Sequence, residues 1–68
     1  MDELVVDARG LPCPQPVLRT RDAIVQASGA VRVLVDDPAQ GENVAALARN
    51  NGWQAQIETR GGDTHVLL

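Results

Sequence analysis

Cys13 is the side chain in this sequence with the clearest capacity for covalent chemistry. It stands in the segment Gly10-Leu11-Pro12-Cys13-Pro14-Gln15-Pro16 and is the single cysteine of the 68-residue chain. A lone thiol forms no internal disulfide, and one cysteine with the one histidine, His65, supplies too few ligands for a zinc site. Cys13 is therefore either a small buried apolar residue or a reactive thiol. We expect no metal and no cofactor.

The prolines around Cys13 predict a helix that begins directly after it. Proline is tolerated in the first turn of a helix, where N–H groups have no acceptor within the helix. A residue that precedes proline avoids the α region. We therefore place Cys13 at the N-cap, Pro14 at the first helical position and Pro16 at the third. The N–H group of Gln15 is then the best-placed donor toward the Cys13 sulfur.

This position should make the thiol reactive and accessible. The positive end of the helix dipole favours a thiolate over a thiol, which raises the nucleophilicity of the sulfur at neutral pH. Arg9, four residues earlier, can add to this field. A cysteine hydrolase needs a base beside its thiol, and nothing in the sequence places His65 there. A CxxC oxidoreductase needs a second cysteine. What remains for Cys13 is to accept a group, hold it and pass it on.

The elements that must position Cys13 follow from hydrophobic periodicity. In the strand that precedes it, we expect Leu4 and Val6 to point inward and Asp7 outward. The predicted elements are a strand at 3–8, a helix from 14 to about 28, a strand at 31–35, a helix at 38–50 and strands at 53–58 and 64–68.

Short polar residues and glycines mark the ends of these elements. Gly29 stands where the C-terminal glycine of the first helix is expected. Asp37 can cap the second helix, with Pro38 at its first position. The pair Asp36-Asp37 also suggests paired-carboxylate catalysis, but capping by Asp37 explains it more simply. Gly61-Gly62-Asp63 predicts the turn of a hairpin.

The order of these elements predicts an α+β two-layer sandwich. Two right-handed crossovers in a β-α-β-α-β-β chain place both helices on one face of a mixed four-stranded sheet. A chain of 68 residues suits one domain, 1–68, with a small aliphatic core. Trp53, the only aromatic residue, should be partly buried. Leu18 and Val25 are either core residues or, with Leu11, an apolar patch beside the thiol that a donor protein contacts.

Charge narrows the choice of partners. Nine acidic residues oppose six arginines, which gives a net charge of −3 and no basic stripe for nucleic acid. The acidic N-terminus does not match a secretory signal, and no apolar stretch approaches the ~20 residues that span a bilayer. We therefore expect a soluble cytoplasmic protein that binds neither nucleic acid nor membrane.

The segment around Cys13 resembles the TusA-like sulfur carriers, a family that includes SirA and YedF. Their signature is a strand that ends in an Asp-containing turn, followed by Gly-Leu-x-Cys-Pro-x-Pro at the start of the first helix. The sequence matches it without departure, as Asp7-Ala8-Arg9-Gly10-Leu11-Pro12-Cys13-Pro14-Gln15-Pro16-Val17. The resemblance covers the whole chain and includes Val35-Asp36-Asp37-Pro38. Two further segments look most like YedF-type N-terminal domains: Glu42-Asn43-Val44 and Gly62-Asp63-Thr64-His65-Val66-Leu67.

The resemblance implies that Cys13 carries a persulfide sulfur. The sulfur would come from a donor protein, a cysteine desulfurase or a rhodanese-like protein, and go to a DsrE-like or other sulfur relay component. The motif residues that would support Cys13 are Asp7, Arg9, Gly10, Leu11, Pro14, Gln15 and Pro16.

The subtype carries implications of its own. YedF-type proteins are associated with selenium metabolism and usually continue into a DsrE-like domain. The chain is thus either a stand-alone carrier or the N-terminal part of a two-domain protein. The alternative function is a regulatory or protein-interaction module in which Cys13 never carries sulfur.

Overall fold

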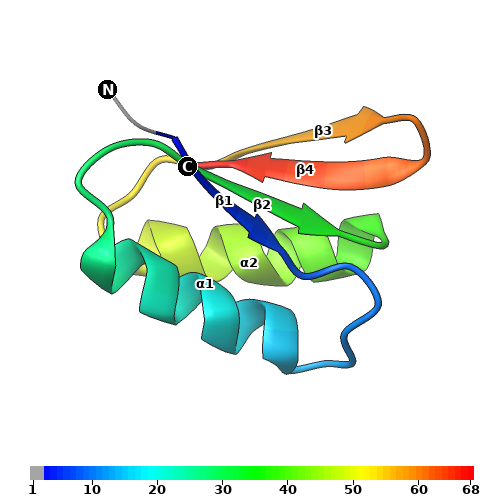
Figure 1. The fold of residues 1–68 in the computed structure, drawn as a ribbon, viewed down its shortest axis with the longest axis horizontal. Helices are drawn as coiled ribbons and strands as arrows, with labels where there is room; N and C mark the ends of the chain where they lie inside the picture. The colour runs from blue at the N-terminus through cyan, green and yellow to red at the C-terminus, as the bar shows by residue number, and fades with distance from the viewer. Residues whose placement is uncertain (1–2) are drawn as a thin grey trace.

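One four-stranded sheet and two helices make up the computed structural model, which describes residues 3–68 (Figure 1). Both helices lie side by side against one face of the sheet, and the other face is open. This is the predicted two-layer sandwich with the predicted element order. The elements are β1 (Leu4–Asp7), α1 (Gln15–Gln26), β2 (Val31–Val35), α2 (Pro38–Asn50), β3 (Gln56–Arg60) and β4 (Asp63–Leu67).

Strand β2 is central to both the sheet and the core. The strand order is β1-β2-β4-β3, in which β2 pairs in parallel with β1 and antiparallel with β4. Val31, Val33 and Val35 point toward the helices and are at most 1% exposed. A strand that is buried in this way fixes its register, because a slip of one residue would turn all three valines outward.

The helices complete the core with small residues. Helix α2 contributes Val44, Ala45 and Ala48, each fully buried, and α1 contributes Ala23 and Ile24. Such side chains let the helices approach the sheet closely. Gly41 on α2 packs directly against Thr64 of β4.

The helix ends agree with the sequence in one case and differ in the other. The Asp37 carboxylate caps α2 by accepting a hydrogen bond from the Gln40 N–H (2.9 Å), as predicted. Helix α1 ends at Gln26, and Ala27 already has an extended backbone (φ −74°, ψ 137°). The assignment of Gly29 as the C-terminal glycine was therefore wrong, because the chain leaves the helix without the left-handed residue that favours glycine.

The boundaries of the hairpin also differ from those predicted. Gly61 and Gly62 form a two-residue turn with φ of 58° and 90°, so Asp63 belongs to β4 and pairs with Arg60. The same register pairs Gln56 with Leu67, and β3 begins there and not at Trp53. The Trp53 N–H instead donates to the Ala48 carbonyl of α2 (2.9 Å), and its side chain is half-buried, as predicted.

Three large apolar side chains of the described residues are exposed: Leu4, Val5 and Val25. Leu4 faces α1, as predicted for the inward side of β1, but it is 43% exposed because β1 is an edge strand. Val25 is 81% exposed and is therefore not a core residue. Leu11, in contrast, is half-buried and packs against the core. The three residues Leu11, Leu18 and Val25 thus differ in burial and do not form a uniform exposed patch.

The close approach at Gly41 can be tested with a double-mutant cycle. A Cβ atom at this position would lie 2.9 Å from Cγ2 of Thr64. Overpacking typically costs ~1–3 kcal/mol, which exceeds the ~1 kcal/mol that Ala gains over Gly in a helix. Gly41→Ala should therefore lower the free energy of unfolding by about 1 kcal/mol in urea denaturation.

Thr64→Ser removes the opposing methyl group and provides the control background. Gly41→Ala should be neutral or stabilising there, because the helix preference then acts alone. An equal loss in both backgrounds would show that the two residues are not in close contact.

Candidate functional site

Cys13 is exposed and lies in the loop at residues 8–14, between β1 and α1. This loop is at the end of the molecule where β1 and β2 finish and both helices begin (Figure 1). The helix starts later than predicted: Pro14 is the N-cap, Gln15 is the first helical residue and Pro16 the second. Cys13 therefore precedes the cap, so its sulfur belongs to the loop and not to the first helical turn.

The backbone bonds around Cys13 also correct the expected contact of the sulfur. The Gln15 N–H donates to the Pro12 carbonyl oxygen at 2.8 Å and so closes a turn around Cys13 and Pro14. It is not the donor to sulfur that the spacing predicted, since the turn takes up this group. The first helical bond follows, from the Leu18 N–H to the Pro14 carbonyl (3.1 Å).

The first half of the loop is bonded to the neighbouring strand and helix. The Ala8 N–H donates to the Leu34 carbonyl (2.9 Å), which continues the pairing of β1 with β2. The Gly10 N–H donates to Oδ2 of Asp36 at 2.7 Å. Gln40 of α2 donates through Nε2 to the Leu11 carbonyl at 3.4 Å. Residues 8–11 are thus tied to the junction between β2 and α2.

Gly10 is required by the path of the backbone. Its φ of +78° lies in the left-handed region, which costs residues with a side chain roughly 1–2 kcal/mol. A Cβ atom at Gly10 would meet nothing within 4 Å, so this backbone conformation alone explains the glycine. The turn at Gly10 directs its N–H group to the Asp36 carboxylate.

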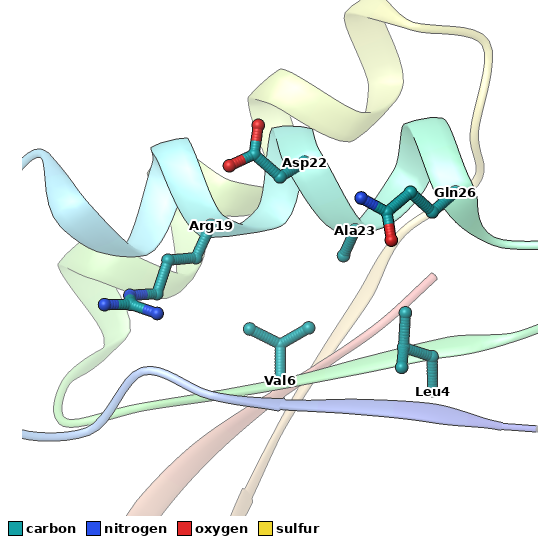
Figure 2. A pocket seen from close by; sticks show the side chains of 6 residues that line it. All are labelled: Leu4, Val6, Arg19, Asp22, Ala23 and Gln26. Carbon is teal, nitrogen blue, oxygen red and sulfur yellow. The ribbon is translucent and has the colours of Figure 1, made fainter.

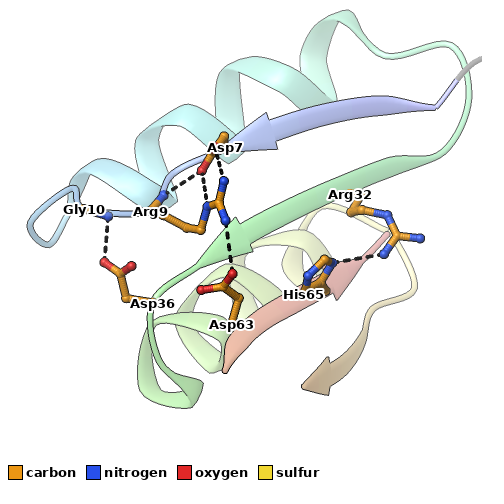
Figure 3. A network of polar contacts seen from close by, with 7 residues as sticks. All are labelled: Asp7, Arg9, Gly10, Arg32, Asp36, Asp63 and His65. Carbon is orange, nitrogen blue, oxygen red and sulfur yellow. Dashed lines mark hydrogen bonds and ion pairs between the residues drawn. The ribbon is translucent and has the colours of Figure 1, made fainter. Parts of the chain in front are cut away.

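Arg9 is held between two carboxylates on neighbouring segments (Figure 3). Its guanidinium donates to Asp7 through Nε (2.8 Å) and Nη2 (2.7 Å), and to Asp63 through Nη1 (3.0 Å). The side-chain bonds from Arg9, with a further bond from its backbone N–H, lower the pKa of Asp7 to about 2. Bonds to Asp7, and then to Asp63, raise the pKa of Arg9. Arg9 therefore joins the loop to β4, and its charge is compensated there, whereas the sequence had suggested a field at the thiol.

His65 lies on the open face of the sheet, within contact distance of Arg32 (Figure 3). Arg32 Nη1 is 3.1 Å from His65 Nδ1, and the imidazole is half-buried on this face. Cys13 precedes α1 in the helical layer, on the other side of the sheet. The structure thus provides His65 with a structural partner and no role as a base for the thiol.

Two surface hollows lie away from the thiol. One, of about 250 Å³, is the space between β1 and α1 that Figure 2 shows. The other, of about 220 Å³, adjoins it near the loop that follows α1. Cys13 lines neither of them. Within residues 3–68 there is also no group of three or more potential metal ligands.

Hydropathy adds one observation on the helices. In the described part of the chain, neither helix is long and apolar enough to cross a membrane.

Fold and site together define a class of protein: a small α/β sandwich that presents one exposed cysteine from a tethered loop. The family described as "Sulfurtransferase TusA" matches residues 4–68. The sulfur carrier protein TusA of Allochromatium vinosum is 33% identical over 66 residues, which cover 93% of this chain and 87% of that protein. The chain belongs to the TusA family of sulfur carriers.

A crystal structure supports the same relationship. The SirA-like protein of Desulfitobacterium hafniense superimposes with a TM-score of 0.85 at 32% sequence identity. The similarity covers 94% of this chain and 92% of that one. The resemblance to TusA and SirA that the motif around Cys13 indicated is therefore confirmed.

The sequence analysis missed three contacts to the loop, which Asp36, Gln40 and Asp63 make. Asp36 was considered as one half of a carboxylate pair and as part of the segment Val35-Asp36-Asp37-Pro38, Asp63 was placed in the hairpin turn, and Gln40 was not singled out. One signal was present. Asp36 directly follows the buried central strand, at the same end of the sheet as the loop with Cys13. The contact itself joins residues 26 positions apart and needs the folded structure to be seen.

The ion pair between Arg9 and Asp7 makes a testable prediction about titration. Arg9→Met should raise the pKa of Asp7 from about 2 toward its ordinary value near 3.8. The pKa of Asp7 is lower in the folded protein than in the unfolded chain. The ion pair therefore stabilises the folded protein at pH values above the ordinary pKa of 3.8. That contribution disappears as the pH falls through about 2. Carboxyl ¹³C chemical shifts, followed by NMR against pH, measure this pKa.

Arg32→Met is the matched control for Arg9→Met. Arg32 is an arginine near the same open face, but it contacts Glu3 and His65 and not Asp7. The substitution Arg32→Met should therefore leave the titration of Asp7 unchanged. An Asp7 that titrates identically in wild type and Arg9→Met would contradict the pairing.

Proposed function

We propose that this protein carries sulfur as a persulfide on Cys13. The observation that supports this most directly is an exposed thiol within a complete TusA motif, on a loop whose base is bonded to the core. The chain provides no second thiol with which a persulfide on Cys13 would form an internal disulfide. A sulfur carried by these 68 residues is therefore retained until an acceptor thiol outside them removes it.

The transfer consists of two displacements at sulfur. The Cys13 thiolate attacks the terminal sulfur of a donor persulfide, the S–S bond of the donor breaks, and the donor leaves as a thiolate. A new S–S bond now joins that sulfur to Cys13. An acceptor thiolate then attacks the same terminal sulfur and releases Cys13 as a thiolate. Each step exchanges one S–S bond for another, so no external oxidant or reductant is needed.

The partners in this proposal are proteins. The donor is a cysteine desulfurase or a rhodanese-like protein, and the acceptor is a DsrE-like or other relay component. The hollows that we describe do not include Cys13, which favours delivery by a docked protein over capture of a small molecule. Near the open face, Arg9, Arg32 and Arg60 each contact a carboxylate. This pairing argues against binding of nucleic acid there.

We further propose that the chain is a domain of the YedF type. The similarity of residues 42–44 and 62–67 to that subtype supports this assignment. On this proposal residues 1–68 form one carrier domain that precedes a DsrE-like domain, and the carried element includes selenium. Sequencing the gene past the codon for Leu68 tests the domain arrangement directly.

Mass spectrometry tests the carrier function. After incubation with a cysteine desulfurase and cysteine, the intact protein should gain one sulfur atom, which dithiothreitol should remove by reducing the persulfide. Cys13→Ala should gain none. If Cys13→Ala gains the same mass, the site is wrong. If the wild type gains no sulfur from desulfurase, rhodanese-like protein or inorganic polysulfide, the interaction module without sulfur chemistry becomes the better description.

A further inference from the structure

We propose that Asp36 and Gln40 are positioning residues for the Cys13 sulfur. They do not contact the sulfur. Both hold the base of the loop, residues 8–11, and so determine where its tip, residues 12–14, is presented to a protein donor or acceptor. The role in sulfur transfer rests on the proposed function. The role in holding the loop does not.

The bond between Asp36 and Gly10 is the main contact. Its length of 2.7 Å and its ionised acceptor place it among the short, charge-assisted hydrogen bonds. Asp36 directly follows Val35, which is fully buried, so its backbone is fixed by the core. The carboxylate of Asp36 therefore fixes Gly10 relative to the end of β2. Gly10 lies three residues before Cys13.

Gln40 provides the second contact and links it to the first. Its side-chain Nε2 donates to the Leu11 carbonyl at 3.4 Å, while its Oε1 accepts from the Asp36 N–H at 3.3 Å. Its own backbone N–H is held by the Asp37 cap at 2.9 Å. One side chain from the first turn of α2 thus bridges the loop and the end of β2.

Among residues 3–68, we find no comparable attachment to the tip of the loop. Pro12, Pro14 and Pro16 lack N–H groups, and the Gln15 N–H bonds locally to Pro12. Leu11 is the last residue before Cys13 for which we find a side-chain bond from another element. The sulfur is therefore accessible, and its position depends on the residues that hold the base of the loop.

This arrangement matters most when both reacting thiols belong to proteins. A docked donor fixes the place of its own sulfur, so the Cys13 sulfur must meet it in line with the S–S bond. A misplacement of ~1 Å can cost on the order of 100-fold in rate. A small persulfide in solution approaches the sulfur wherever it lies. The two kinds of donor thus separate positioning from intrinsic reactivity.

Neighbouring carboxylates supply matched variants. Asp36→Ala removes the acceptor for Gly10, and Asp36→Asn keeps an oxygen acceptor without the charge. Asp37→Ala removes the cap of α2 but no hydrogen bond to residues 8–14, because its carboxylate accepts from the Gln40 backbone N–H. It therefore controls for a general loss of stability at the same junction.

NMR first tests the contact without any sulfur donor. Asp36→Ala should accelerate hydrogen exchange of the Gly10 amide by about tenfold and increase the backbone mobility of Leu11 and Cys13. Asp36→Asn should resemble the wild type, and Asp37→Ala should leave the Gly10 amide protected. Unchanged exchange at Gly10 in Asp36→Ala, or an equal change in Asp37→Ala, would overturn the proposal.

Single-turnover kinetics then test the effect on transfer. With a persulfide-loaded protein donor at saturating concentration, Asp36→Ala should transfer sulfur to Cys13 at least about tenfold more slowly, and Asp36→Asn should recover most of the rate. With cysteine persulfide as the donor, all variants should lie within about twofold of the wild type.

The outcomes are distinguishable. Equal losses with both donors, or no loss with the protein donor, would contradict positioning by Asp36. A wild type that takes sulfur from neither donor would refute the proposed function, and the exchange of the Gly10 amide would still decide whether Asp36 holds the loop.

Discussion

The burial of β2 is the constraint on which the rest of the structure depends. Its three valines fill the centre of a small aliphatic core, and its backbone bonds to β1 on one side and β4 on the other. The end of β2 is consequently held by the core and by both neighbouring strands. Asp36 directly follows that end and binds the loop with Cys13 through a hydrogen bond to the Gly10 N–H.

A small core is sufficient for this kind of chemistry. An enzyme that completes its own reaction must hold several groups around a substrate. A carrier needs one accessible sulfur and a fixed point from which to present it. The structure divides these tasks between a tip in which two prolines flank the thiol and a base bonded to the end of β2, to α2 and to β4.

The elements were predictable where local pattern decides them. Alternating valines gave β2, and Asp37 before Pro38 gave the start of α2. The sequence failed where partners distant in the chain decide. Strand β3 begins at Gln56 because the hairpin register pairs that residue with Leu67.

The candidate site shows the same division between local and distant contacts. Cys13 and its motif were evident from residue types. The partners of Gly10 and Arg9 were not, since Asp36 and Asp63 lie 26 and 54 positions away. The start of α1 was misplaced for a local reason, because a turn closed by Pro12 and Gln15 was as compatible with the prolines as a helix was.

Trp53 has a practical consequence for studies of the molecule. It follows α2 at the end of the sandwich opposite the Cys13 loop and is the only strong fluorophore in the chain (Figure 1). Its half-buried indole packs against the core, so its emission should report unfolding of the whole domain. Sulfur bound at the far end should leave that emission unchanged. Unfolding and sulfur loading can therefore be followed independently in one sample. The fluorescence of Trp53 reports unfolding, and the intact mass of the protein reports sulfur on Cys13.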